Sequence, residues 1–191
     1  MTFEEEQERK GKTYKLLLWF GMISICMIFA GLTSAFVVSK SRPDWLSEIV
    51  LPNIFYYGTV TFVISSFTYI LALNQIKKGL NKVGMFFLTL TLFLGLTFIV
   101  FQFIGFNELY KIGLVVGGPT SEVTISFLGA FALIHLLHLV GGIISLLVVI
   151  YNHYKQKYNS TQTLGIELSA MYWHFMDFIW VYLFLFFYFF K

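Results

Sequence analysis

The sequence predicts an all-α, polytopic membrane helix bundle with five transmembrane helices. Of its 191 residues, 58% are hydrophobic and only 12% are charged, whereas a soluble domain has about 25% charged residues. The apolar residues gather in five runs, each near or above the roughly 20 residues that cross a bilayer. The short connections between the runs hold all three prolines, Pro43, Pro52 and Pro119. We therefore expect a single membrane domain over residues 1–191, and the sequence shows no internal repeat.

The predicted spans follow the apolar runs in chain order. They cover about residues 16–39, 54–74, 83–106, 124–151 and 166–190. The stretch before the first span mixes glutamates with lysines and an arginine, so we expect a short surface helix or frayed tail there rather than a cleaved signal. Nine of the 13 Lys and Arg residues fall in this tail and in the second and fourth connections. Because basic residues concentrate on the cytoplasmic side, the N-terminus is expected to be cytoplasmic and the C-terminus periplasmic.

The last predicted span carries ionisable residues on one face. Glu167, His174 and Asp177 are separated by steps of seven and three residues, which a helix places on the same side. Such groups are costly in lipid, so we expect this face to line a protein interior or a wet cleft. His174 and Asp177 lie one turn apart, and their spacing predicts an imidazole–carboxylate pair.

Polar and small residues also mark faces of the other spans. His135, His138 and Gly142 lie close to one line in the fourth span, and Gln102 lies in the third. We expect Gln102 to hydrogen-bond a neighbouring helix rather than a ligand, and the two histidines to bond a neighbouring helix or a lipid headgroup. In the first span Gly31 and Ala35 belong to a small-residue face that predicts close approach of another helix. The hydroxyls of the second span, Ser65, Ser66 and Thr68, are expected to bond their own helix backbone.

The number of metal-binding residues limits what this chain can catalyse. It has four histidines and one cysteine, Cys26, whereas a haem–copper centre needs about six imidazoles and a dinuclear copper site needs paired cysteines. The chain is therefore not expected to be a redox subunit, and no metal site is predicted. By count alone, a haem between His174 and either His135 or His138 stays open, but hydrogen bonding between helices is the favoured interpretation. The small net charge of +3 gives no indication of a nucleic-acid partner.

Several motifs resemble subunit III of the haem–copper cytochrome c oxidases. The strongest is the run Tyr172-Trp173-His174-Phe175-Met176-Asp177-Phe178-Ile179-Trp180, preceded by Gly165-Ile166-Glu167. The stretch from His135 to Gly142 resembles H-G-L-H-x-x-x-G of the same family, and Gln102 with Glu108 resembles the end of a further family helix. Residues 23–36 also match a family helix, except that Ile25 replaces its intramembrane carboxylate. That replacement puts a proton-related role for this helix in doubt.

The resemblance implies a function and a set of site residues. It implies the short five-helix bacterial form of a non-catalytic subunit in the bacterial inner membrane. The subunit would bind phospholipid in a cleft, dock on the catalytic subunit I together with subunit II and further subunits, and support sustained turnover and proton uptake. Haem and copper would lie in those partners. The expected cleft residues are His135, His138, Glu167, Tyr172, Trp173, His174, Asp177 and Trp180, and the expected helix-packing residues are Gly31, Ala35, Gln102 and Gly142.

Two alternatives to a cytochrome c oxidase subunit stay open at the level of sequence. The same motifs occur in the related subunit of quinol oxidases or of nitric-oxide reductase clusters. A small membrane transporter could use the same polar face as a substrate path, but such folds usually carry internal repeats and broken spans, which this sequence lacks.

Overall fold

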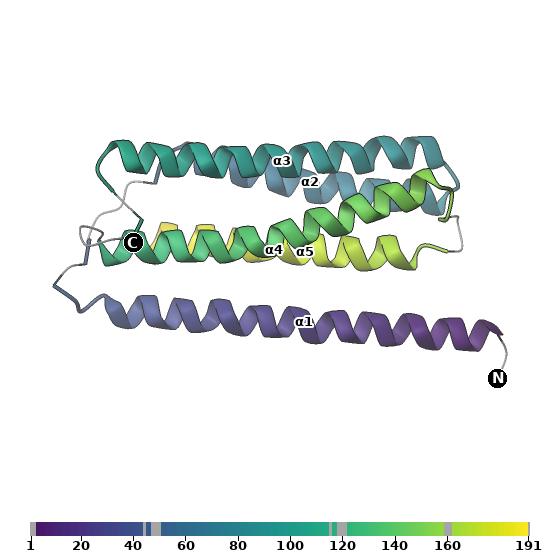
Figure 1. The fold of residues 1–191 in the computed structure, drawn as a ribbon, viewed down its shortest axis with the longest axis horizontal. Coiled ribbons are helices and arrows are strands. Elements are labelled where there is room, and N and C mark those ends of the chain that lie inside the picture. Colours follow the sequence, from purple (N-terminus) through teal and green to yellow (C-terminus); the bar gives the residue numbers. More distant parts are fainter. Residues whose placement is uncertain are drawn as a thin grey trace.

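The computed structural model describes residues 3–43, 45–46, 51–114, 116–117, 122–158 and 162–190. It contains five α-helices (Figure 1). They are α1 (Phe3–Ser39), α2 (Ile54–Lys77), α3 (Asn81–Lys111), α4 (Val123–Tyr154) and α5 (Leu164–Phe190). All five are long and apolar enough to cross a membrane, which confirms the predicted fold class.

The first helix extends well beyond its predicted span. It begins at Phe3 instead of near residue 16, because the polar segment continues the helix rather than fraying. Ion pairs one turn apart join Lys10 to Glu6 and Lys12 to Glu8, each at 2.8 Å. Pairs at this spacing support an exposed helix. The other four helices begin and end within five residues of the predicted bounds.

Glycines with positive φ follow two of the helices. Gly79 (φ 78°) follows α2 and Gly113 (φ 87°) follows α3. After each glycine, the next backbone N–H turns back to a carbonyl of the last helical turn, from Leu80 to Gln75 and from Leu114 to Leu109. This is the usual helix stop at a left-handed residue, where glycine has no steric penalty.

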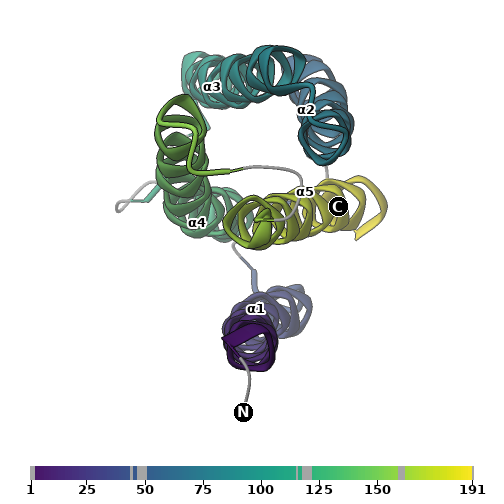
Figure 2. The same cartoon turned by 90° about the vertical axis from the view of Figure 1, so that its right-hand side faces the viewer.

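Four helices surround a common core, and α1 stands outside them. Figure 2 shows α2, α3, α4 and α5 arranged around one axis, with α1 to one side. In the described part of the chain, α1 contacts α4 and α5 only. The start of α1, the α2–α3 turn, the end of α4 and the start of α5 lie at one end of the molecule, and the end of α5 lies at the other (Figure 1). We call the first of these the inner end, following the predicted orientation.

The two halves of α1 differ in how they pack. Met22, Phe29, Thr33 and Phe36 are buried, and the Phe36 ring contacts Phe127, Phe131, Phe186 and Phe187. Among residues 5–21, with Gln7 outside the described side chains, none is buried. Aromatic packing therefore fixes the outer half, whereas the inner half lies against the bundle without a buried anchor.

Candidate functional site

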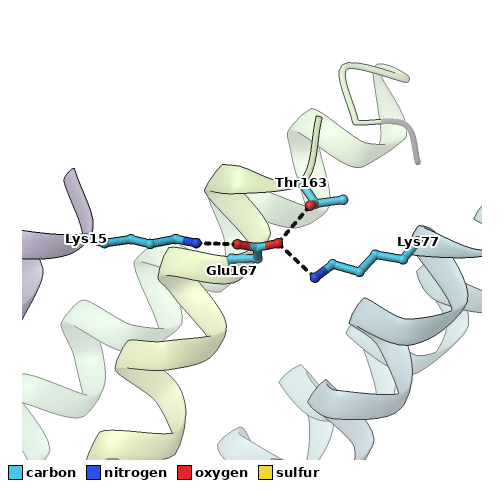
Figure 3. A network of polar contacts seen from close by, with 4 residues as sticks. All are labelled: Lys15, Lys77, Thr163 and Glu167. Carbon is cyan, nitrogen blue, oxygen red and sulfur yellow. Dashed lines mark hydrogen bonds and ion pairs between the residues drawn. The ribbon is translucent and has the colours of Figure 1, made fainter. Parts of the chain in front are cut away.

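A carboxylate near the start of α5 connects three helices. The Glu167 Oε2 atom accepts from the Lys15 ammonium of α1 at 2.8 Å, and its Oε1 atom accepts from the Lys77 ammonium of α2 at 2.8 Å (Figure 3). The Thr163 hydroxyl donates to the same Oε1 at 3.0 Å. Oε1 thus has two donors, while Lys15 is the donor found on Oε2. With a Glu167 side chain that is 23% exposed, this network lies at the inner end of the bundle rather than in its core.

Hydroxyl groups of α2 meet ring nitrogens of α5 along a shared seam. Trp173 Nε1 donates to Ser65 Oγ at 3.1 Å, His174 Nδ1 and Ser66 Oγ are 2.8 Å apart, and Trp180 Nε1 donates to Thr59 Oγ1 at 3.0 Å. Together with the Lys77–Glu167 ion pair, these bonds run from the inner end past the middle of the helices. The polar face predicted for the last span is therefore turned toward α2.

The predicted pair between His174 and Asp177 is wrong as a direct contact. The imidazole bonds Ser66 instead, and the same hydroxyl interacts with the Asp177 carboxyl. In the described chain the Asp177 Oδ1 atom is buried without a hydrogen-bond partner. A serine from another helix therefore stands between the two groups, which helical spacing within α5 could not reveal.

The serines of α2 have a larger role than the sequence predicted. Ser65 and Thr68 do bond their own backbone, to Phe62 O at 2.6 Å and to Ser65 O at 2.8 Å. Ser65 and Ser66 nevertheless also reach α5, and Thr68 reaches the Thr91 hydroxyl of α3 at 2.8 Å. The sequence signal for these contacts was the pair Ser65-Ser66, because two adjacent hydroxyls can bond the ring nitrogens of the adjacent residues Trp173 and His174.

Trp173 occupies the centre of the bundle. Its side chain is fully buried, and its ring lies against glycines of two other helices. A Cβ atom added at Gly95 of α3 would be 2.7 Å from the ring, and one added at Gly142 of α4 would be 3.5 Å from it. Gly142 thus lies where α4 and α5 approach closely.

His135 and Gln102 line a lateral cavity between α3 and α4. The cavity measures about 480 Å³, and apart from these two residues, Ser126 and Trp180, apolar residues and glycines make up its lining. Both His135 ring nitrogens and both Gln102 amide atoms are buried without a partner in the described chain. The His135 ring packs against Trp180 at 5.1 Å and against Phe98 at 6.2 Å. The expected interhelical hydrogen bonds of these two residues are therefore not formed.

His138 of α4 and Tyr172 of α5 lie toward α1. The Tyr172 hydroxyl donates to the His138 carbonyl at 3.0 Å, and His138 Nδ1 is 2.8 Å from the Ile134 carbonyl oxygen. The His138 ring faces Phe29 of α1, with centroids 6.1 Å apart. His138 and His174 are not among the residues that line the cavity beside His135.

Two cavities lie beneath the inner half of α1 and share Gly165. The one nearer the membrane centre measures about 440 Å³ and is lined by Tyr14, Leu18, Gly141, Ser145, Gly165, Leu168, Ser169 and Tyr172. The other, at the inner end, measures about 700 Å³ and is lined by Glu8, Gly11, Lys12, Lys15, Lys157, Tyr158, Gln162, Thr163, Leu164, Gly165 and Glu167. We call the two together the inner cleft. It is largely uncharged toward the bilayer centre and charged at the surface.

The predicted site residues therefore lie in four places rather than in one cleft, since His138 lies apart from the others beside Phe29 of α1. Glu167 and Tyr172 line the inner cleft, Trp173, His174 and Asp177 lie on or beside the α2–α5 seam, and His135 lines the α3–α4 cavity with Trp180. Within the described ranges, no three His, Cys, Asp or Glu side chains form a group that could hold a metal ion.

Gly31 and Ala35 do not pack on another helix of this chain. Both are exposed, and a Cβ atom added at Gly31 would meet nothing within 4 Å. At these two positions α1 faces away from the bundle, so the predicted helix contact is not made within the described part of the chain.

Comparison with known proteins identifies the family. The sequence profile described as cytochrome c oxidase subunit III matches residues 5–191. A cytochrome bo(3) ubiquinol oxidase subunit 3 from Buchnera aphidicola subsp. Schizaphis graminum is 28% identical over 189 residues, which cover 96% of each chain. The cytochrome c oxidase subunit 3 of Alkalihalophilus pseudofirmus is 26% identical, and the quinol oxidase subunit 3 of Bacillus subtilis is 27% identical. Each alignment covers 94% of this chain and 88% of the relative. With a match over nearly all of its length and five membrane-length helices, the chain belongs to the cytochrome c oxidase subunit III family of the haem–copper oxidases.

Proposed function

We propose that this chain is the non-catalytic subunit III of a bacterial respiratory terminal oxidase and that it holds phospholipid in the inner cleft. The observation that carries the lipid assignment is the chemistry of that cleft. Lys12 and Lys157 line its surface end, and Leu18 and Leu168 line the part that reaches into the membrane. A phospholipid has the same order, with a phosphate at the surface and acyl chains below.

The reaction itself is proposed to occur in other subunits. The family places this chain beside a catalytic subunit, and we propose that haem and copper are bound there, with subunit II and further subunits completing the complex. This chain contributes a packed helix bundle and the phospholipid held in its inner cleft. A lipid held there would keep the catalytic subunit in a constant environment and so support sustained turnover and proton uptake.

Two electron donors are candidates. The resemblance predicted cytochrome c, and the Alkalihalophilus pseudofirmus relative carries that name. Quinol is the second candidate, because several relatives of similar identity are named quinol or ubiquinol oxidase subunits. Oxygen consumption by the purified complex with reduced cytochrome c, and separately with a quinol, tells the two apart.

The lipid role is tested by variants of the cleft cations. We expect Lys12→Gln together with Lys157→Gln to reduce the phospholipid that co-purifies with the complex, measured by mass spectrometry. The same variant should shorten the time over which oxygen consumption persists while leaving the initial rate unchanged. Lys82→Gln is the matched control, because it removes an exposed inner-end cation that does not line the cleft. Unchanged lipid content and unchanged activity lifetime in the double variant would contradict the proposal.

A further inference from the structure

The inner half of α1 is arranged as a strap over the inner cleft. The outer half of the helix is fixed by Phe29 and Phe36, whereas no described residue from 5 to 21 is buried. Tyr14, Leu18 and Lys15 of this half form one wall of the two cavities. If this half moved away from the bundle, the cleft would open toward the bilayer.

The ion pair between the strap and the bundle can break without leaving an unpaired carboxylate. Lys15 bonds Glu167 Oε2, while Lys77 and Thr163 bond Oε1 (Figure 3). When Lys15 leaves, the carboxylate therefore keeps two donors and is not left as an unpaired charge. The Lys15 and Glu167 side chains are 41% and 23% exposed, and ion pairs this close to water contribute little to stability.

Two further lysine side chains line the cleft and could bind an anion that competes with Glu167. Lys12 and Lys157 line the cavity that contains Lys15 and Glu167. A phosphate anion entering there would meet three ammonium groups and would compete with Glu8 for Lys12 and with Glu167 for Lys15. The adjoining cavity lined by Leu18 and Leu168 favours a phosphate that carries acyl chains over a free one.

From this arrangement we propose that Lys15 and Glu167 form an ionic latch that an anionic phospholipid opens. In the closed state Lys15 holds the strap on α5, and in the lipid-bound state its ammonium turns to the lipid phosphate and the inner half of α1 separates from Leu164. The inference rests on the proposed lipid role of the same cleft and adds its regulation. It makes the negative charge of the headgroup, rather than acyl chains alone, the signal that moves the helix.

Disulfide trapping in the intact complex tests the latch. Gly11 is a residue of the strap on the face that meets α5, since a Cβ added there would be 3.6 Å from the Leu164 side chain. Gly11→Cys and Leu164→Cys, with the native Cys26 changed to Ser, report the closed state as the rate of disulfide formation. Peptide mass spectrometry assigns the disulfide to this chain. The complex is placed in nanodiscs of phosphatidylcholine alone, of phosphatidylcholine with phosphatidylglycerol, or of phosphatidylcholine with inorganic phosphate in the buffer.

We expect phosphatidylglycerol to slow trapping by about two- to fivefold, the factor that a partly exposed ion pair is worth. Lys15→Met should slow trapping in phosphatidylcholine to a similar extent and abolish the response to phosphatidylglycerol. Lys77→Met leaves the Lys15 bond in place and should retain the fast rate in phosphatidylcholine, but its response to phosphatidylglycerol should be weaker, because Glu167 would keep only Thr163 when Lys15 leaves. An unchanged rate with phosphatidylglycerol, or a Lys77→Met variant that behaves like Lys15→Met, would overturn the latch.

Slowing by inorganic phosphate as strong as that by phosphatidylglycerol would overturn its assignment to a lipid. Loss of the chain's association with an oxidase would instead contradict the proposed function, so the two failures are distinguishable.

Discussion

The contact between Gly95 and Trp173 gives the sharpest stability prediction. A methyl group at Gly95 would lie 2.7 and 2.9 Å from two atoms of the Trp173 ring, well inside van der Waals contact. The ring cannot move away easily, because it is fully buried, is bonded to Ser65 and has Gly142 on another side. Forcing an extra methyl into such a core typically costs about 1–3 kcal/mol.

A matched glycine separates this clash from the intrinsic effect of alanine. Alanine is favoured over glycine inside a helix by about 1 kcal/mol, and this gain applies equally at Gly21, where an added Cβ meets nothing within 4 Å. Gly95→Ala should therefore be less stable than Gly21→Ala by about 1–3 kcal/mol. For a chain of this size that corresponds to roughly 2–4 °C of melting temperature per kcal/mol.

The assay is the temperature at which half of this chain is lost from the purified complex, followed by size-exclusion chromatography. A second variant fixes the cause, because Trp173→Phe removes the ring atoms that the new methyl would meet. Gly95→Ala should then cost less in the Trp173→Phe background than in the natural one, which a double-mutant cycle measures as a coupling between contacting residues. Equal melting temperatures for Gly95→Ala and Gly21→Ala, or an absent coupling, would refute the packing described for the bundle centre.

Two further predictions concern the seam and the orientation. Ser66→Ala should destabilise the chain by about 0.5–1.5 kcal/mol, because it removes the hydrogen-bond partner of the half-buried His174 Nδ1. Thr61→Ala is the control, since its exposed hydroxyl bonds its own helix at Tyr57 O, and equal melting temperatures of the two variants would argue against the seam. Cysteines replacing Lys78 and Lys111 should react with a membrane-impermeant reagent from opposite sides, with Lys78 labelled from the cytoplasm. Labelling of both from one side would contradict the five-span orientation.

The helices could be predicted from sequence because each apolar run is long enough to cross a bilayer and is bounded by a short polar connection. Gly79 and Gly113 follow predicted spans closely, so chemistry along the chain sets where α2 and α3 end. A short surface helix was one of the two expectations for the segment before the first span, but its continuity with that span was not predicted, because apolar content indicates membrane crossing, whereas this polar segment is helical through local ion pairs. The family was also recognisable, because the Trp173–Asp177 region combines rare residue types in a fixed order.

The arrangement of the site residues was harder to predict. In a membrane protein apolar side chains cover both the core and the lipid face, so hydrophobicity does not tell which face of a helix meets which neighbour. His135 and His138 are three residues apart, yet the His135 ring packs on Phe98 and Trp180 of α3 and α5, whereas the His138 ring packs on Phe29 of α1. The Ser66 contact to His174 joins residues 108 positions apart, and no helical periodicity encodes such a distance.

Purification of the chain from its native membrane tests the central claim most directly. Tagged at its C-terminus and extracted in mild detergent, the chain should co-purify with a catalytic oxidase subunit, haem and copper in constant proportion to one another. After it is separated from that complex, the chain itself should retain neither haem nor copper. Recovery of the chain without an oxidase subunit or metal, or a haem spectrum that stays with the separated chain, would contradict its assignment as a non-catalytic subunit III.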